Sequence, residues 1–252
     1  MTVRIARIPY LSCEPFYFDM ERRGIELYDM APNILAEAAI RDQIDAGPIP
    51  LTDCRRLDEQ FRYLSGFCLA TIRRAGSVVL HSKVPIQELA GCRIAVSSEA
   101  ATSSLLLKVL LGLKHQVQPA AYVTHEDVYD ASLLIGSEGL RQRHGVWDYP
   151  HTYDLGEEWH QWTSLPFVFA RWMVRKTLDR KDVAVLEDML YVGLQDWADG
   201  IFRSSDTRDD VLMHPRDILE YTQGLRYFLG VPEQRAIELF ARHLEQLNGQ
   251  SQ

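Results

Sequence analysis

Residues 93–113 read RIAVSSEAATSSLLLKVLLGL, and this stretch decides the fold. Arg93 to Val96 is short and apolar enough for a buried strand, whereas Thr102 to Leu113 repeats apolar residues at helical spacing. The turn between them is rich in hydroxyl side chains. A strand, a polar turn and an apolar helix in this order are typical of α/β sheets, in which ligands bind at the strand ends that lead into helices.

Two more polar turns stand beside apolar runs. Residues 10–15, YLSCEP, follow the apolar run from Val3 to Leu11, and residues 162–166, WTSLP, precede an apolar strand from Pro166 to Val174. The first amides of a helix carry N–H groups without helical partners and a partial positive charge, which suits an anion. We therefore predict anion binding at the turns near Ser12 and Ser103.

The chain alternates strands and helices as far as Arg175, and three helices are expected after it, over Lys181 to Asp199, Pro215 to Leu229 and Pro232 to Leu247. This order predicts an α/β fold with two lobes, a ligand cleft between them and C-terminal helices. The first lobe would hold residues 1–83 and 172–252, and the second residues 84–171. One continuous doubly wound sheet is the alternative. Residues 151–160 are expected to form a solvated polar loop.

Composition excludes several classes of function. The 252 residues carry a net charge of −8, which disfavours a nucleic-acid partner. Apolar runs stay far below the roughly 20 residues that a membrane helix needs, and the N-terminus lacks a signal-peptide pattern. The four cysteines, Cys13, Cys54, Cys68 and Cys92, match no metal or disulfide spacing. We expect a cytoplasmic protein with no metal, no cofactor, no nucleic acid and no membrane partner; a homodimer is left open.

Each candidate residue has a structural alternative. Ser12 could bind a ligand or could share the N-cap role with Cys13, and Thr102 and Ser103 could bind an anion or simply cap their helix. Glu14 is a candidate general base. Arg74 and Arg171 are candidate partners for an anionic ligand, and Arg171 is the sharper case, because a lone arginine in an apolar strand must be paired or reach a cleft.

Seven segments together resemble a known family in order and spacing. They are RIPYL (7–11), DAGPIP (45–50), SVVLHSKVPI (77–86), TSSLLLK (102–108), DASLLIG (130–136), YDLGEEW (153–159) and LPFVFARW (165–172). The chain resembles the MqnA/MqnD group of menaquinone-biosynthesis proteins, with a closer likeness to the chorismate dehydratases of the futalosine route.

The resemblance implies a type II periplasmic-binding-protein-like fold and a cofactor-independent hydro-lyase. Its substrate would be a small dicarboxylate, chorismate, which loses water to give 3-[(1-carboxyvinyl)oxy]benzoate. Catalytic roles would fall to Ser12 and Glu14. The expected substrate-binding residues are Tyr10, Ser12, Pro48, Arg74, Ser82, Thr102, Ser103, Ser137, Leu165 and Arg171.

The chain departs from the family pattern at three positions. Ser12 stands where the family usually has an asparagine, Ser137 where it often has aspartate, and Ser164 where it usually has glycine. A serine offers one donor where an amide offers two. Two alternatives to the dehydratase follow: a non-catalytic binding protein for an aromatic or cyclic carboxylate, and the sister enzyme that acts on a cyclic futalosine intermediate.

Overall fold

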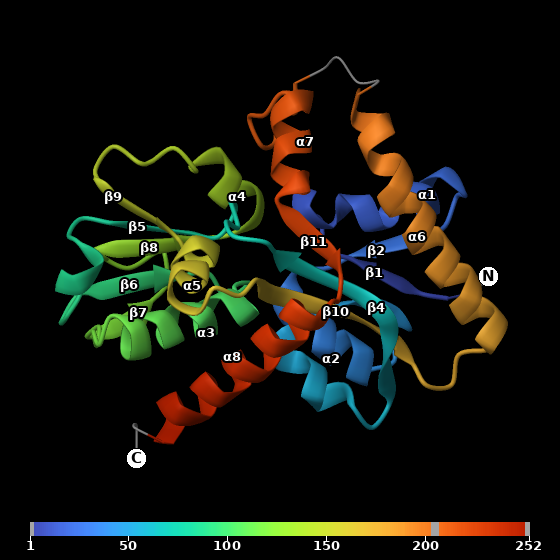
Figure 1. Ribbon diagram of the computed structural model, residues 1–252, viewed down its shortest axis with the longest axis horizontal. Coiled ribbons are helices and arrows are strands. Elements are labelled where there is room, and N and C mark those ends of the chain that lie inside the picture. The colour runs from blue at the N-terminus through green and yellow to red at the C-terminus, as the bar shows by residue number, and fades with distance from the viewer. Residues whose placement is uncertain (1–2, 203–206, 250–252) are drawn as a thin grey trace. The chain divides into compact units, whose positions relative to one another are not determined.

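The computed structural model describes residues 3–202 and 207–249. By its internal contacts the chain divides into two compact units: residues 1–69 with 169–229, and residues 70–168 with 230–252. Each unit contains one β-sheet with helices packed on it (Figure 1). Within the described ranges, no helix is both long and apolar enough to cross a membrane.

The sheet of the first unit has six strands in the order β11-β4-β10-β3-β1-β2. Strand β1 runs parallel to β2 and β3, and β10 runs antiparallel to β3. The strands are β1 (Ile5–Arg7), β2 (Leu27–Asp29), β3 (Ala46–Pro50), β4 (Phe61–Thr71), β10 (Phe167–Arg175) and β11 (Leu225–Phe228). The helices of this unit are α1 (Glu14–Arg22), α2 (Leu35–Ile40), α6 (Arg180–Phe202) and α7 (Pro215–Gln223).

Helix α1 is fixed between the sheet and α6, which lies beside it (Figure 1). Phe16 packs edge-on against Trp172 of β10, with ring centroids 5.5 Å apart, and against Tyr227 of β11 at 5.1 Å. On the α6 side, a Cβ atom at Gly193 would lie 2.9 Å from the carbonyl oxygen of Pro15. Because the two backbones approach this closely, the start of α1 has little freedom to shift.

The sheet of the second unit has five strands in the order β7-β6-β8-β5-β9. Strands β6, β7 and β8 are parallel, and β5 runs antiparallel to β8 and β9. The strands are β5 (Val79–Ser82), β6 (Arg93–Val96), β7 (Ala121–Val123), β8 (Ala131–Leu134) and β9 (His151–Asp154). The helices are α3 (Ala101–Val109), which continues as a π-helical turn (Leu110–Lys114), α4 (Gly136–Arg141), α5 (Leu155–Thr163) and α8 (Val231–Gly249).

The C-terminal helix α8 belongs to the second unit, whereas the sequence placed all three C-terminal helices in the first lobe. An aromatic cluster explains the difference. Phe240 of α8 packs at 5.9 Å from Trp159 and 5.0 Å from Phe167, and the Trp159 indole N–H donates to the carbonyl of Pro166. Burying this much aromatic surface holds α8 on α5. The units also change over near residues 70 and 169, where the sequence suggested 84 and 172.

Two secondary-structure predictions were wrong. Residues 151–160 form β9 and the first part of α5, with Asp154 and Trp159 buried, instead of a solvated loop. The helix predicted to run to Leu229 ends at Gln223, and β11 follows it. In both cases the segment gains a neighbouring strand: β9 pairs with β5, and β11 pairs with β4. Pairing between distant segments overrode the local pattern.

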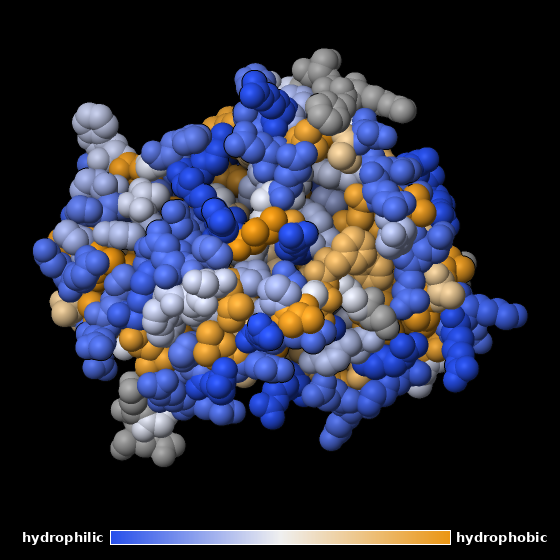
Figure 2. Space-filling view, in the orientation of Figure 1, coloured by the Kyte–Doolittle hydropathy of each residue, from blue (hydrophilic) through white to orange (hydrophobic). Residues whose placement is uncertain are grey.

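Figure 2 shows hydrophilic side chains over most of one face, with hydrophobic residues scattered among them, as is normal for a face that contacts water.

Candidate functional site

The turn after β1 carries Tyr10, Ser12 and Glu14. A short 3-10 turn, Leu11–Cys13, joins β1 to α1, and the Cys13 amide donates to the Tyr10 carbonyl at 2.8 Å. Ser12 is 8% exposed. The N-cap residue of α1 is Cys13, whose side chain makes no cap hydrogen bond in the described part of the chain. Of the two cap candidates, Cys13 is therefore the N-cap residue of α1 and Ser12 is not. The Ser12 hydroxyl instead lies 3.9 Å from Cys13 Sγ.

Cys13 is not a nucleophile. Its side chain is fully buried, and this burial raises the pKa of the thiol to about 12. The reactive form of cysteine is the thiolate, which is scarce at neutral pH when the pKa is so high. The chemistry of this turn is therefore left to Ser12, Glu14 and the backbone.

Glu14 is held by an arginine from the far end of the first unit. Arg208 donates from Nη1 to Glu14 Oε2 at 3.0 Å and from Nη2 to Oε1 at 2.8 Å, and it also donates to Asp210. These two carboxylates raise the pKa of the Arg208 guanidinium. The paired, planar geometry fixes the orientation of the Glu14 carboxylate. Sequence reasoning missed Arg208 because it lies 194 residues from Glu14.

A pocket of about 390 Å³ opens beside this ion pair, and Arg7, Glu14, Glu21, Trp197, Arg208 and Asp210 are among its lining residues. Its arginines already have acidic partners, since Arg7 pairs with Glu21 and Asp29 and Arg208 pairs with Glu14. Ser12 does not line it. With two arginines and three acidic residues in its wall, this pocket is poorly suited to a dianion.

Pro48 and Arg171 lie on opposite faces of the first sheet. In the register of β3 and β10, Pro48 is opposite Trp172 and Arg171 is opposite Ile49, and neighbouring residues of a strand point to opposite faces. The Arg171 guanidinium lies 4.5 Å from the centroid of the Tyr63 ring. Its Nε is buried and finds no hydrogen-bond acceptor among the described residues. The structure therefore does not place Pro48 and Arg171 on one binding surface.

In the second unit, Thr102, Ser103 and Ser137 lie at one edge of the sheet. Strands β6 and β8 are parallel neighbours, and each ends just before one of these turns. Thr102 and Ser103 are buried in the first turn of α3. The N-cap of α3 is Ala100, so neither hydroxyl is the cap residue that sequence reasoning offered as the alternative. This edge has the geometry of a ligand site in an α/β sheet.

Ser82 lies at the opposite edge of the same sheet. Strand β5 runs antiparallel to β8, so Ser82 pairs with Ala131 at the start of β8, whereas Val79 pairs with Leu134 at its end. Ser82 is fully buried, and its hydroxyl accepts from the Val84 amide at 3.3 Å. Ser77, which precedes β5 and was not singled out in the sequence, lies at the same edge as Thr102. The antiparallel direction of β5, which the sequence does not reveal, places Ser77 at this edge and Ser82 at the other.

Arg74 and Leu165 lie near the two ends of α5. Arg74 is exposed, and its Nε is 3.7 Å from the Asp154 carboxylate. Asp154 caps α5 by accepting from the Glu157 amide at 3.0 Å, and it also accepts from the amides of Ala75 and Gly76 at 2.8 and 2.6 Å. Asp154 thus fixes the turn that precedes β5. Leu165 is half-buried in the turn after α5.

Within the ranges that the structure describes, no group of three or more histidine, cysteine, aspartate or glutamate side chains is arranged to hold a metal ion. His151 and His160, which flank the acidic residues of α5, do not form such a group with them.

Solved structures resemble this chain over nearly its whole length. Protein AF1704 from Archaeoglobus fulgidus has a TM-score of 0.69 at 16% identity and covers 97% of both chains. The periplasmic aliphatic sulphonate binding protein SsuA from Escherichia coli has a TM-score of 0.62 at 12% identity, covering 99% of this chain and 92% of that one. The fold is therefore periplasmic-binding-protein-like, as the sequence predicted.

The family is shown by sequence. The family described as "Menaquinone biosynthesis" matches residues 3–246, and the chain belongs to it. A protein named chorismate dehydratase from Thermus thermophilus is 25% identical over 256 residues, which cover 93% of this chain and 92% of that protein. The family assignment made from the seven sequence segments is confirmed.

Proposed function

We propose that this member of the family is a chorismate dehydratase, which removes water from chorismate to give 3-[(1-carboxyvinyl)oxy]benzoate. The proposal is supported by the match over residues 3–246 and by the Thermus thermophilus relative. The observation that carries it within the site is that Ser12 and Ser103 are buried in the turns after β1 and β6 without being helix caps.

The reaction asks little of the protein beyond binding and proton transfer. A base takes the ring proton at C3, the C4–O bond breaks, and the hydroxyl leaves with a proton as water. The ring becomes aromatic, which supplies the driving force, so we propose that no cofactor is needed. The protein must hold two carboxylates and place a base and a hydrogen-bond donor near the reacting atoms.

We assign these tasks to the turn residues. Within the second unit, the first turn of α3 would bind a substrate carboxylate, because helix N-termini attract anions, and Thr102 and Ser103 would add hydroxyl donors. Ser12 would donate to the substrate where the family asparagine normally stands. Glu14, oriented by Arg208, is the candidate base, since its carboxylate keeps acceptor lone pairs while it is paired.

The direct test is incubation with chorismate followed by mass spectrometry for a product lighter by one water. Ser103→Ala should lower kcat/KM about tenfold, the usual loss for one charge-assisted hydrogen bond. Ser104→Ala is the matched control, because the Ser104 hydroxyl donates within its own helix to the Ala101 carbonyl at 2.9 Å. Wild-type protein that is folded yet forms no product above the spontaneous background would refute the dehydratase proposal.

A non-catalytic binding protein is the second candidate. Two observations favour it: Ser12 replaces the family asparagine, and the Glu14 carboxylate is engaged by Arg208. Such a protein would be stabilised against heat by a stable benzoate and would leave chorismate intact. Turnover of chorismate that depends on Ser103 would exclude this candidate.

A further inference from the structure

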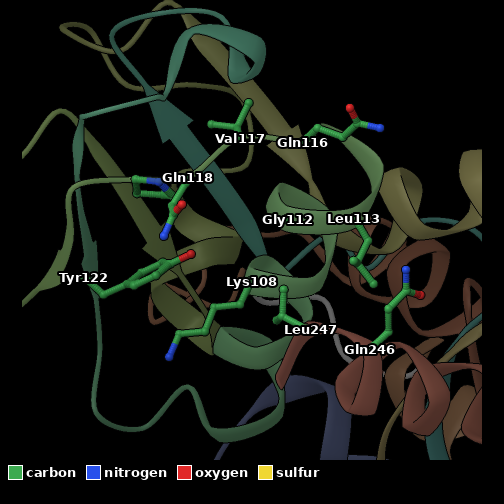
Figure 3. A pocket seen from close by; sticks show the side chains of 10 residues that line it. Lys108, Gly112, Leu113, Gln116, Val117, Gln118, Tyr122, Gln246 and Leu247 are labelled. Atoms are coloured by element: carbon green, nitrogen blue, oxygen red, sulfur yellow. The ribbon is translucent and has the colours of Figure 1, made fainter. Parts of the chain in front are cut away.

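A second pocket lies within the second unit, along the far half of the α3 helical run. It has a volume of about 650 Å³, which is in the range of small-molecule sites. The lining residues come from three elements, namely α3 with its π-helical turn, the segment that leads into β7, and the last turns of α8 (Figure 3). They are Lys108, Gly112, Leu113, Gln116, Val117, Gln118, Pro119, Tyr122, Gln246 and Leu247.

The pocket is separate from the candidate substrate residues of this unit. None of the ten predicted substrate-binding residues lines it. Thr102 begins α3, and Gly112 lies about 15 Å further along the helical run at 1.5 Å per residue. Thr102 lies in the turn after β6, at the start of α3, whereas the pocket is lined by β7, the end of the α3 helical run and α8.

The backbone that forms the pocket wall is unusual in two adjoining places. Leu110–Lys114 forms a π-helical turn, a rare conformation that is concentrated at functional sites. Two residues later, Gln116 adopts a left-handed conformation with φ of 55°. A residue other than glycine adopts this conformation only at a cost in free energy. Strained backbone of this kind persists where the surrounding structure enforces it.

The π-helical turn is held from both sides. Lys114 donates to the Glu158 carbonyl at 2.9 Å and to its carboxylate at 2.7 Å, which ties the turn to α5. On the other side α8 lies close to the turn, since a Cβ atom at Gly112 would lie 2.7 Å from Leu247 Cδ1. The pocket wall is thus built from the π-helical turn, α8 and the segment 116–119 that precedes β7.

The chemistry of the lining favours an anion with a flat apolar body. Lys108 is the one charged residue in the lining, and in the described chain no acidic side chain lies within ion-pair distance of it. Its Nζ lies 4.9 Å from the centroid of the Tyr122 ring. Figure 3 shows the Tyr122 ring lying between the side chains of Gln118 and Lys108. A ring could stack on Tyr122 while its carboxylate meets Lys108 and an amide of glutamine.

We propose that this pocket is a binding site for an aromatic carboxylate, with Lys108 as the anion partner and Tyr122 as the stacking surface. The site is distinct from the residues assigned to catalysis, and it does not require the dehydratase reaction. Leu113 and Leu247 supply the apolar wall for the ring.

The test is isothermal titration calorimetry with 2-naphthoate, a flat bicyclic carboxylate that the pocket volume accommodates. We expect saturable binding to wild-type protein and much weaker binding of 2-naphthalenemethanol, which has the same ring without the charge. Lys108→Gln keeps the aliphatic stem and removes the charge, and it should weaken 2-naphthoate binding at least about tenfold. Gln118→Trp at an exposed position should fill the space and abolish binding. Lys181→Gln, remote on α6, is the charge-matched control.

Ser12→Ala and Ser103→Ala separate this site from the proposed substrate site, and both should bind 2-naphthoate as wild type does. The proposal is overturned if Lys108→Gln and Gln118→Trp bind like wild type, if binding is lost instead in the serine variants, or if wild type shows no saturable binding at millimolar concentrations. Thermal melts establish that each variant is folded. Because no turnover is measured, failure here leaves the dehydratase proposal untouched.

Discussion

Replacing Ser164 with glycine is expected to stabilise the second unit. Ser164 ends α5 in the left-handed conformation, with φ of 59° and ψ of 16°, and its amide donates to the His160 carbonyl at 2.8 Å. The resembled family usually has glycine at this position, and glycine adopts positive φ without a Cβ penalty. The chain retains the glycine-type turn even with a serine in it.

The magnitude follows from two opposing contributions. A left-handed conformation costs a residue with a Cβ atom about 1–2 kcal/mol, which glycine does not lose. Glycine is freer in the unfolded chain, and fixing it costs about 0.5–1 kcal/mol more. The Ser164 side chain is exposed, so its removal sacrifices little packing. The net stabilisation should be about 0.5–1 kcal/mol, or roughly 1–4 °C in Tm for a chain of this size.

The assay is urea unfolding followed by tryptophan fluorescence, with the midpoint raised and the m-value unchanged. Gly24 offers the reverse experiment, because it follows α1 with φ of 69° and a Cβ atom there would meet nothing within 4 Å. Gly24→Ser should therefore destabilise by about 1 kcal/mol through conformation alone. If Gly24→Ser destabilises as expected while Ser164→Gly leaves the midpoint unchanged or lowers it, the strain assigned to Ser164 is refuted.

Two further perturbations test the elements around the site. Gly139→Ala would place a Cβ atom 2.2 Å from the Ser77 carbonyl oxygen, and backbone cannot yield easily. The free energy of unfolding measured in urea should therefore fall by about 2–3 kcal/mol. An unchanged free energy of unfolding would contradict this packing. Burial raises the pKa of Glu158, but hydrogen bonds from His115 and Lys114 lower it more, so the folded-state pKa is depressed. The stability that this carboxylate contributes is present above the unfolded pKa of about 4.3 and is lost as pH falls through the folded value. Glu158→Gln should therefore lower Tm at pH 7 and converge with wild type in acid; a constant difference down to pH 3 would contradict the assignment.

Strand and helix positions could be predicted where the local pattern and the tertiary environment agree. Arg93–Val96 was predicted as a strand with the bounds observed for β6. The prediction was possible because this short apolar run is followed by a hydroxyl-rich turn and an apolar helix. β9 was missed because HTYD is polar and because its partner, β5, is distant in the sequence: Val79 of β5 pairs with Asp154, 75 residues later. An edge strand needs only one neighbour, and the sequence does not name that neighbour.

Some residues of the candidate site could likewise be predicted from the local sequence, and others could not. The turns at Ser12 and Ser103 were found because hydroxyl-rich turns after apolar strands are visible in the sequence. Ser82 was expected beside Ser103 from the family resemblance, yet the antiparallel direction of β5 places it at the other edge of the sheet. Arg208 could not be found, since its partnership with Glu14 depends on how α1 and the segment after α6 pack.

The N-cap residues of α1 and α3 decide whether helix capping can explain the serines in these two turns. If Ser12 and Ser103 were N-caps, helix stability alone would explain them, because a cap is worth about 1 kcal/mol. The N-caps are instead Cys13 and Ala100, so that explanation fails at both turns. The Ser12 hydroxyl does have a partner, since it lies 3.9 Å from Cys13 Sγ, so its burial alone does not call for a ligand. Each serine is 8% exposed at the end of a strand that feeds a helix, which is where α/β sheets bind their ligands, and this position within each unit supports a binding role.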